Sequence, residues 1–298
     1  MAKTVGILLA DRVTAGLIVE HKLAGPLRYF PENPENDDAL VEIPADGLIE
    51  LLCKKVVAAA KGTKLDGVGV GVPGLIRSGV VEEAPNLPQL KGQNISETLG
   101  AALQKLGIDA PVTIVNDADA MAAGLAATSG QLDRLIRVWT LGRGVGYGRY
   151  PFSEGVWEGG HTIVSLDDKE RFCGCGGRGH LEGIMGHRAM RLRFLDMEPE
   201  EIFAAAKAGD ERCVAFKKLW HKSLAAATAT SVHMAGPGKF YITGTGTAFL
   251  DIAMLKDYMQ QMVKMSPLIG YSLVVIEEEA ETAVIGAGVT AEQAAAGR

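Results

Sequence analysis

The segment RFCGCGGRGHLEG, residues 171–183, contains two of the four cysteines of the chain, Cys173 and Cys175, followed by His180. His161 lies twelve residues before Cys173. Two thiolates and two imidazoles are the donor set of a tetrahedral structural zinc site, and the intervening glycines allow the chain to fold back. Two alternatives remain on spacing alone. One is a redox pair, which the Cys-x-Cys spacing disfavours, and the other is a loop with free thiols and unrelated histidines.

The composition restricts the class of protein. The chain has 298 residues, of which 47% are hydrophobic and 22% charged, as in globular proteins with one large or two medium domains. A net charge of −6 without blocks of like charge disfavours a nucleic-acid or membrane-surface partner. No apolar run approaches the roughly 18 residues of a membrane span, and the N-terminus lacks a signal-peptide pattern. Four cysteines are too few for a disulfide scaffold, so we expect a cytoplasmic protein.

Predicted strands alternate with predicted helices, which indicates an α/β fold. In the first half we expect strands at 4–10, 16–23, 65–74 and 110–117, and helices at 46–62, 94–107 and 118–130. In the second half we expect a strand pair at 135–150, helices over 186–235, a strand in 239–249, and a last strand followed by a closing helix. Gly62 and Ser96 are the expected C-cap and N-cap of the two early helices.

Two glycine turns follow buried strands, LGRGVGYG at 141–148 and TGTGT at 243–247. Bare backbone N–H groups in such turns can face phosphate oxygens. Neither turn matches a P-loop or a dinucleotide fingerprint. Nucleotide phosphate binding and a purely structural turn therefore both remain open from these turns alone.

Several motifs together resemble the ROK family (repressors, open reading frames and sugar kinases). CGCGGRGHLE resembles its Cys-x-Cys-Gly-x-x-Gly-Cys-x-Glu signature, EGGH at 158–161 its Glu-x-Gly-His motif, and IVNDADAMAAG its Asn-Asp-Ala-Asn-Ala-Ala segment. VGVGVPG followed by PNLP, and the late YITGTGT and AVIGAGVTA, match in the same order. The resemblance implies a two-domain actin-like (ribonuclease H-like) ATPase fold with an interdomain cleft. We expect a smaller domain of residues 1–117 plus about 284–298, and a larger one of 118–283 that carries the zinc loop.

The resemblance also implies roles for individual residues. Asp117 matches the catalytic base, although an aspartate after a strand can equally cap the next helix. The implied sugar contacts are Asn86, Asn116, Asp117, Glu158, His161 and Glu182. The implied ligands of a structural Zn²⁺ that shapes the sugar pocket are His161, Cys173, Cys175 and His180. His180 stands where the family has its third cysteine, so the loop must accommodate a longer side chain.

The N-terminal turn departs from the family pattern. Where active members carry Asp-x-Gly-Gly-Thr, this chain has LLADR, with Leu8 at the aspartate position and Ala10, Asp11 and Arg12 after it. A shifted alignment retains Asp11 as the aspartate but restores no glycine. The second phosphate turn changes from Gly-Thr-Gly to Gly142-Arg143-Gly144. We expect ATP with Mg²⁺ to contact Arg12, Gly142, Arg143, Gly144, Gly244, Thr245 and Gly246.

Two functional classes follow. The first is an ATP-dependent hexokinase or glucokinase-type enzyme that phosphorylates a hexose hydroxyl, expected to be the 6-hydroxyl of glucose or a related sugar. The second is a lapsed kinase that binds sugar as a sensor. The family's repressors carry an N-terminal helix-turn-helix, and this chain starts at its first strand, so a DNA-binding role is not expected. An actin-like filament protein would not use the sugar and zinc motifs. The expected assembly is a homodimer.

Overall fold

The computed structural model describes residues 2–32, 39–152, 158–277 and 280–297. The chain forms two compact units. The first consists of Met1–Ile136, Gly148–Val156 and Glu279–Arg298, and the second of Arg137–Tyr147 and Trp157–Glu278. These divisions differ from the expected domain boundaries at 117 and 284, because the helix after Asp117 packs within the first unit against the C-terminal helix.

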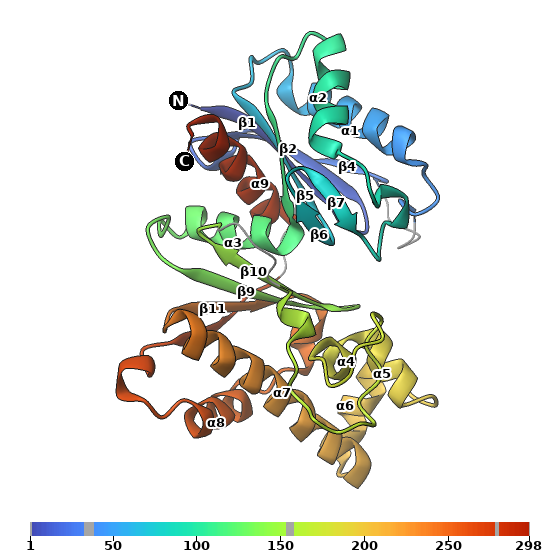
Figure 1. Cartoon of the computed structure of the whole chain (residues 1–298), viewed down its shortest axis with the longest axis vertical. Coiled ribbons are helices and arrows are strands. Elements are labelled where there is room, and N and C mark those ends of the chain that lie inside the picture. Colours follow the sequence, from blue (N-terminus) through green and yellow to red (C-terminus); the bar gives the residue numbers. More distant parts are fainter. Residues whose placement is uncertain (1, 33–38, 153–157, 278–279, 298) are drawn as a thin grey trace. The chain divides into compact units, whose positions relative to one another are not determined.

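The first unit contains a six-stranded sheet with the order β3-β2-β1-β5-β8 and with β4 paired to β2 (Figure 1). Its strands are β1 (Lys3–Leu9), β2 (Val13–Val19), β3 (Lys22–Leu23), β4 (Arg28–Phe30), β5 (Gly67–Val72) and β8 (Val112–Asn116). Strands β1, β5 and β8 are parallel, whereas β1 and β2 are antiparallel. The carboxyl ends of three strands therefore meet at one edge, where open α/β sheets bind ligands.

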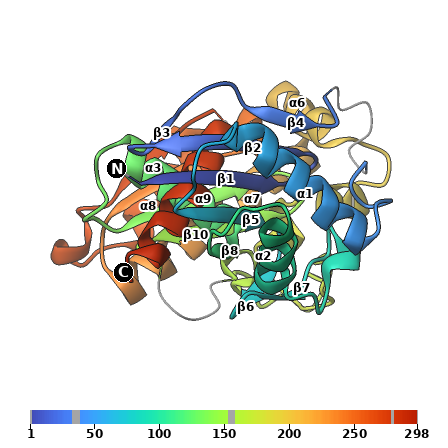
Figure 2. The same cartoon turned by 90° about the horizontal axis from the view of Figure 1, so that it is seen from above.

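Helices cover both faces of this sheet (Figures 1 and 2). The helices on one face are α1 (Ala45–Ala60) and α2 (Ile95–Lys105), and those on the other are α3 (Asp117–Thr128) and α9 (Ala280–Ala295). Alternation along β1 explains the two layers. Val5, Ile7 and Leu9 enter the core shared with α1. The intervening residues face α9, since a Cβ at Gly6 would lie only 1.8 Å from the carbonyl oxygen of Val284.

The second unit is built on a four-stranded sheet with the order β10-β9-β11-β12. Its strands are β9 (Ile136–Leu141), β10 (Val145–Tyr150), β11 (Lys239–Thr243) and β12 (Ser272–Val275), of which β9 starts and β10 ends in the first unit. Its helices are α4 (Glu182–Met185), α5 (His187–Arg193), α6 (Pro199–Ala208), α7 (Glu211–Ala235) and α8 (Ile252–Met262). Trp139, Trp220 and Phe240 are buried at the centre of its core.

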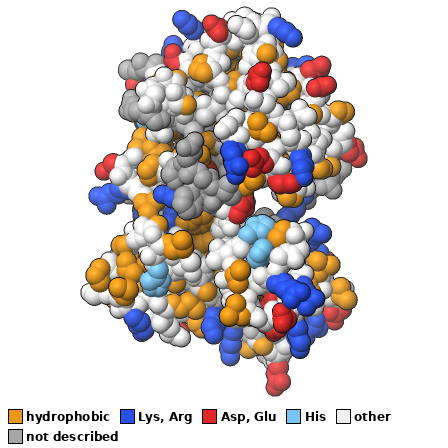
Figure 3. Space-filling model, viewed as in Figure 1, with side chains coloured by type: hydrophobic (Ala, Val, Ile, Leu, Met, Phe, Trp, Pro, Cys, Tyr) orange, Lys and Arg blue, Asp and Glu red, His pale blue; other side chains and the backbone are white. Residues whose placement is uncertain are grey.

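Short elements complete the chain. They are the hairpin β6 (Leu75–Arg77) and β7 (Val80–Glu83), and the 3-10 helices η1 (Pro88–Leu90), η2 (Gly159–His161), η3 (Thr245–Phe249) and η4 (Ser266–Leu268). The helices of the described chain include none with the length and apolarity needed to cross a membrane. On the face drawn in Figure 3, acidic and basic side chains are interspersed with apolar ones, as the small net charge of −6 suggests.

The predicted order of strands and helices is confirmed, but both expected caps were misplaced. Helix α2 is capped by Asn94, whose Oδ1 accepts the Glu97 N–H at 3.2 Å, and not by Ser96. Helix α1 ends at Ala60, its C-cap residue is Lys61 with the left-handed φ of +47°, and Gly62 follows with φ +78°. An asparagine and a serine two residues apart are both good caps, so sequence alone does not choose between them.

Candidate functional site

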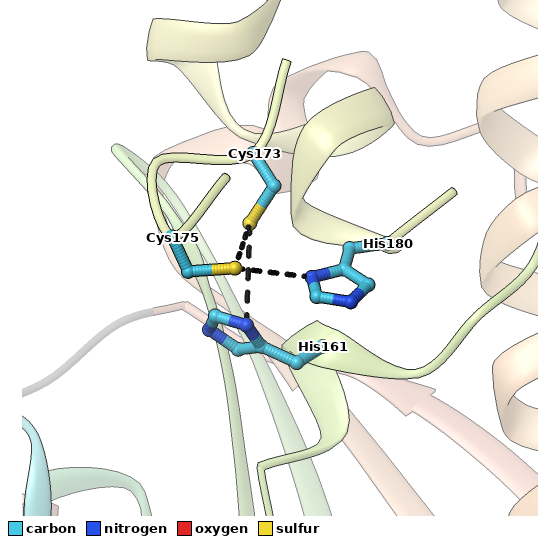
Figure 4. A group of neighbouring side chains, drawn as sticks. All are labelled: His161, Cys173, Cys175 and His180. Atoms are coloured by element: carbon cyan, nitrogen blue, oxygen red, sulfur yellow. Dashed lines mark hydrogen bonds between the residues drawn. The ribbon is translucent and has the colours of Figure 1, made fainter. Parts of the chain in front are cut away.

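The four predicted zinc ligands converge in the second unit (Figure 4). The donor atoms of His161, Cys173, Cys175 and His180 all lie within 4.8 Å of one another. The two Sγ atoms are 3.4 Å apart, Cys175 Sγ is 3.3 Å from His180 Nδ1, and Cys173 Sγ is 4.0 Å from His161 Nδ1. The fold therefore brings together four residues that are up to nineteen positions apart in sequence.

This donor set fits a zinc ion. Zinc lies about 2.3 Å from sulfur and about 2.0–2.1 Å from nitrogen in tetrahedral sites, so its donors are roughly 3.3–3.8 Å apart. The three separations given above, 3.3, 3.4 and 4.0 Å, are close to this range, and all donor pairs lie within 4.8 Å. Without an ion, burial raises the pKa of the Cys173 thiol to about 12. A hydrogen bond with the Cys175 backbone opposes this rise in pKa, and the Cys175 side chain and Glu182 add to it. A bound cation would reverse this preference by stabilising the thiolate.

Glycines make room for the cluster. A Cβ at Gly177 would lie 2.1 Å from Cε1 of the His180 ring, and one at Gly179 would lie 1.9 Å from the carbonyl oxygen of Ser165. Gly179 also has φ +68°, a conformation that favours glycine. The longer side chain of His180 is thus accommodated by the absence of a side chain at position 177, a neighbour that the motif alone did not identify.

The predicted sugar-contact residues of the second unit lie beside the cluster. The carboxylate of Glu182 accepts the Val145 N–H at 3.1 Å and the Cys173 thiol at 3.6 Å. The carbonyl oxygen of Glu158 accepts the backbone N–H of His161 at 3.0 Å. Partial burial raises the pKa of the Glu158 carboxyl, an effect that His161 opposes and Glu182 reinforces. Burial and His161 lower the pKa of His180. Two carboxylates and an imidazole can accept and donate hydrogen bonds to a polyol.

The predicted sugar-contact residues of the first unit lie at the end of β8 and in the loop after β7. Asn116 caps α3, because its Oδ1 accepts the Ala118 N–H at 2.8 Å, and its Nδ2 donates to the Gly74 carbonyl at 2.9 Å. Asp117 is the first residue of α3, and its Oδ1 also contacts the Ala118 N–H at 2.9 Å. The N-cap residue of α3 is therefore Asn116 and not Asp117. Asn86 is exposed in the loop between β7 and η1.

The two glycine turns of the second unit are neighbours. Gly142 N–H donates to the Gly144 carbonyl at 3.0 Å, which closes the first turn. A Cβ at Gly142 would lie 3.6 Å from Thr245 Oγ1 in the second turn. Gly244 has φ +96°, and a Cβ there would be 2.2 Å from the Leu141 carbonyl oxygen. The two turns that carry the predicted phosphate-contact residues Gly142, Arg143, Gly144, Gly244, Thr245 and Gly246 therefore lie next to each other, with Gly244 and Gly246 buried.

The β1–β2 turn has a different construction. Ala10 N–H donates to the Arg12 carbonyl at 3.1 Å, so the turn closes on itself. Leu8 lies on β1, and its Cδ1 is 3.3 Å from the Cβ position of Gly71. The guanidinium of Arg12 lies 4.1 Å above the ring of Tyr29. Sequence reasoning missed Tyr29, because the three-residue strand β4 is too short to give a periodic pattern.

Comparisons with known proteins agree with these observations. The ROK family model matches residues 37–294. A glucokinase of Pyrobaculum calidifontis is 29% identical over 208 residues, covering 64% of this chain and 67% of the relative. An N-acetylmannosamine kinase of Haemophilus influenzae is 28% identical over 237 residues, covering 74% and 77%. The crystal structure of a ROK hexokinase from Thermus thermophilus superposes with a TM-score of 0.81 at 22% identity, covering 99% and 100%. The predicted actin-like fold class is confirmed.

Proposed function

Because the chain belongs to the ROK family, we propose that it is a sugar kinase that transfers the γ-phosphoryl group of ATP to a hydroxyl group of a hexose. The similarity to a glucokinase and to an N-acetylmannosamine kinase supports a hexose or an N-acetylated hexosamine as the acceptor. We expect the 6-hydroxyl to be phosphorylated.

The observation that carries this proposal is the setting of Asp117. It begins α3 at the carboxyl end of β8, and Asn116 ties this point to the loop after β5 through Gly74. A carboxylate held at this edge can accept the proton of a sugar hydroxyl as the oxygen attacks phosphorus. A protein that only binds sugar needs no such base, so the retained aspartate favours the kinase.

The residues that match the sugar contacts of the family would bind the acceptor. We assign hydrogen bonds to sugar hydroxyls to Asn86, Asn116, Glu158, His161 and Glu182. A Zn²⁺ ion held by His161, Cys173, Cys175 and His180 would supply a structural cross-link for this loop. His161 would face zinc with one ring nitrogen and sugar with the other, which fixes its tautomer.

The phosphate side would use side-chain charge. In the ungapped alignment Arg12 and Arg143 both stand where the family pattern has threonine, and a guanidinium can bind phosphate oxygens in a bidentate manner. The glycine turns around Gly142 and Gly244 offer close backbone approach to ATP with Mg²⁺. The second candidate function, a sugar sensor without ATP use, is favoured by one observation, the apolar Leu8 at the position of a metal-binding aspartate.

The test is ADP release from Mg·ATP with a panel of hexoses and N-acetylated hexosamines. The Asp117→Asn variant should lose about 100- to 10,000-fold in kcat with the preferred sugar. Asp109→Asn, at an exposed aspartate of the same chain, is the matched control and should retain full activity. Turnover of no sugar, with sugar binding still measurable by calorimetry, would favour the sensor. If Asp117→Asn retains its turnover, Asp117 is not the general base.

A further inference from the structure

We propose that Tyr29 is a positioning residue that holds Arg12 for the phosphate groups of the nucleotide, an inference that rests on the proposed kinase function. The family pattern binds phosphate at the β1–β2 turn with backbone amides of glycines. In this chain one side chain would take over that task, and a second side chain from β4 would support it.

Strand registers place Tyr29 in a row that crosses the sheet. Tyr29 pairs with Thr14, Thr14 with Leu8, and Leu8 with Gly71. Directly paired residues of neighbouring strands point to the same face of a sheet. Figure 2 shows the strands β4, β2, β1 and β5 that carry this row.

The same face carries the catalytic candidate. A Cβ at Gly71 would lie 3.2 Å from the Cβ of Ala120 and 3.6 Å from the Cα of Asp117. The face with Tyr29 is therefore the face of α3, and Arg12 and Asp117 both follow the carboxyl ends of parallel strands. The stacked arginine thus lies at the edge and on the face of the sheet where the proposed base begins its helix.

Part of the backbone at the β1–β2 turn is already paired. Its flanking residues Leu9 and Val13 are paired with each other in the sheet, and the Ala10 N–H is bonded to the Arg12 carbonyl. Leu8 replaces a carboxylate with an apolar group. Arg12 is the basic side chain of this turn, and it stands next to the acidic Asp11.

The Arg12 side chain is half-buried and held on one flat face only. Its guanidinium lies 4.1 Å above the Tyr29 ring, and it makes no hydrogen bond or ion pair with any other residue that the structure describes. Stacking on an aromatic face leaves the N–H groups at the edge of the guanidinium available. A long side chain with many rotamers is thereby restricted before an anion arrives, which lowers the entropy cost of binding.

The experiment compares Tyr29→Leu with Tyr29→Phe in the full chain. Phe keeps the aromatic face, so the KM for Mg·ATP should stay close to that of the unmodified protein. Leu removes the face, and the KM for Mg·ATP should rise by about 2- to 30-fold, with the KM for sugar unchanged. Phe30→Leu is the matched control, because Phe30 is the next residue of β4 and packs into the core on the opposite face.

A double variant tests whether Tyr29 acts through Arg12. Arg12→Met combined with Tyr29→Leu should be no worse for Mg·ATP than Arg12→Met alone. Additive losses would overturn the inference, as would equal losses in Tyr29→Phe and Tyr29→Leu, or a parallel rise of the sugar KM. Thermal unfolding of each variant, followed by circular dichroism, identifies any that fail to fold.

Calorimetric titration with Mg·ATP separates this inference from the proposed function. If the unmodified protein binds Mg·ATP but phosphorylates no sugar, the kinase proposal fails. In that case, weaker binding of Mg·ATP by Tyr29→Leu and unchanged binding by Tyr29→Phe would still support Tyr29 as a positioning residue. If the unmodified protein does not bind Mg·ATP, the inference is overturned.

Discussion

Gly177 tests whether His180 is the fourth zinc ligand. Position 177 is variable in the motif Cys-x-Cys-Gly-x-x-Gly-Cys-x-Glu, and position 180 is a cysteine there. In this chain histidine and glycine occur together, and the imidazole occupies the space that a side chain at 177 would need. The perturbation is Gly177→Ala, which adds one methyl group and no charge.

The magnitude follows from the geometry. The new Cβ would lie 2.1 Å from Cε1, 2.6 Å from Nε2 and 2.8 Å from Nδ1 of His180. To reach an ordinary contact of 3.4 Å, the ring would have to retreat by about 1.3 Å. Metal–ligand bonds tolerate roughly 0.2 Å. His180 should therefore leave the ion, and zinc affinity should fall by about 10- to 100-fold, or roughly 1.4–2.8 kcal/mol.

The assay is competition for Zn²⁺ between the protein and a chromogenic chelator, supported by the visible spectrum of the Co²⁺-substituted protein. Loss of one ligand should weaken the absorption of tetrahedral Co²⁺, because water enters the coordination sphere. The matched control is Gly174→Ala in the same loop, whose Cβ would meet only the flexible end of Arg188, at 2.9 Å from Nη1. This control should bind zinc as the unmodified protein does.

A rescue makes the test specific. In Gly177→Ala combined with His180→Cys, the shorter thiolate no longer needs the space at 177, so zinc affinity should return. Unchanged affinity and an unchanged Co²⁺ spectrum in Gly177→Ala alone would refute His180 as a ligand in this arrangement. Equal losses in Gly174→Ala would show that the loop is disturbed in general.

Three further predictions concern stability. Gly286→Ala should destabilise the first unit by about 3 kcal/mol or more, because its Cβ would lie 1.7 Å from the Ala120 carbonyl oxygen of α3. Gly100→Ala on α2, which meets only Val112 at 3.7 Å, should instead stabilise by about 0.5–1 kcal/mol in urea unfolding. His221 is buried, accepts the Asp251 N–H at 2.8 Å, and has a pKa lowered chiefly by burial. The unfolded chain takes up its proton near pH 6.5, so stability should fall as pH drops below this value. The fall should be smaller in His221→Gln and unchanged in the control His233→Gln, an exposed residue of the same helix.

Local patterns predicted most of the strands and helices, because apolar periodicity and glycine punctuation act over a few residues. The cluster of His161, Cys173, Cys175 and His180 was predictable for the same reason, since three of these residues fall within eight consecutive positions. The assignment of α3 to the first unit was not predictable from local patterns. It joins the first unit through contacts such as that of Gly124, where a Cβ would lie 1.8 Å from the Thr282 carbonyl oxygen of α9. A contact between residues so distant in sequence leaves no local signal.

The roles of Tyr29 and Gly177 were not predicted, because they too depend on three-dimensional contacts and not on a local pattern. The absence of glycines after Leu8 is visible in the sequence, and so is Arg12. Their consequence depends on β4, which reaches Arg12 only through its pairing with β2. Tyr29 therefore cannot be identified as a site residue until the registers of β1, β2 and β4 are known. Gly177 is similar, because its role depends on the orientation of one imidazole ring.

The altered phosphate turns are best understood together. Loss of glycines at the β1–β2 turn and replacement of threonine by Arg143 both exchange neutral backbone or hydroxyl donors for guanidinium groups. A site that had lost ATP use would have no reason to gain cations at both turns, or to hold Arg12 against an aromatic ring with its N–H edge unused by the described residues. The presence of Asp117 at the start of α3 points the same way, since the proposed general base would assist phosphoryl transfer and is not needed for binding alone. We therefore favour a kinase that binds phosphate through arginine side chains over a lapsed one.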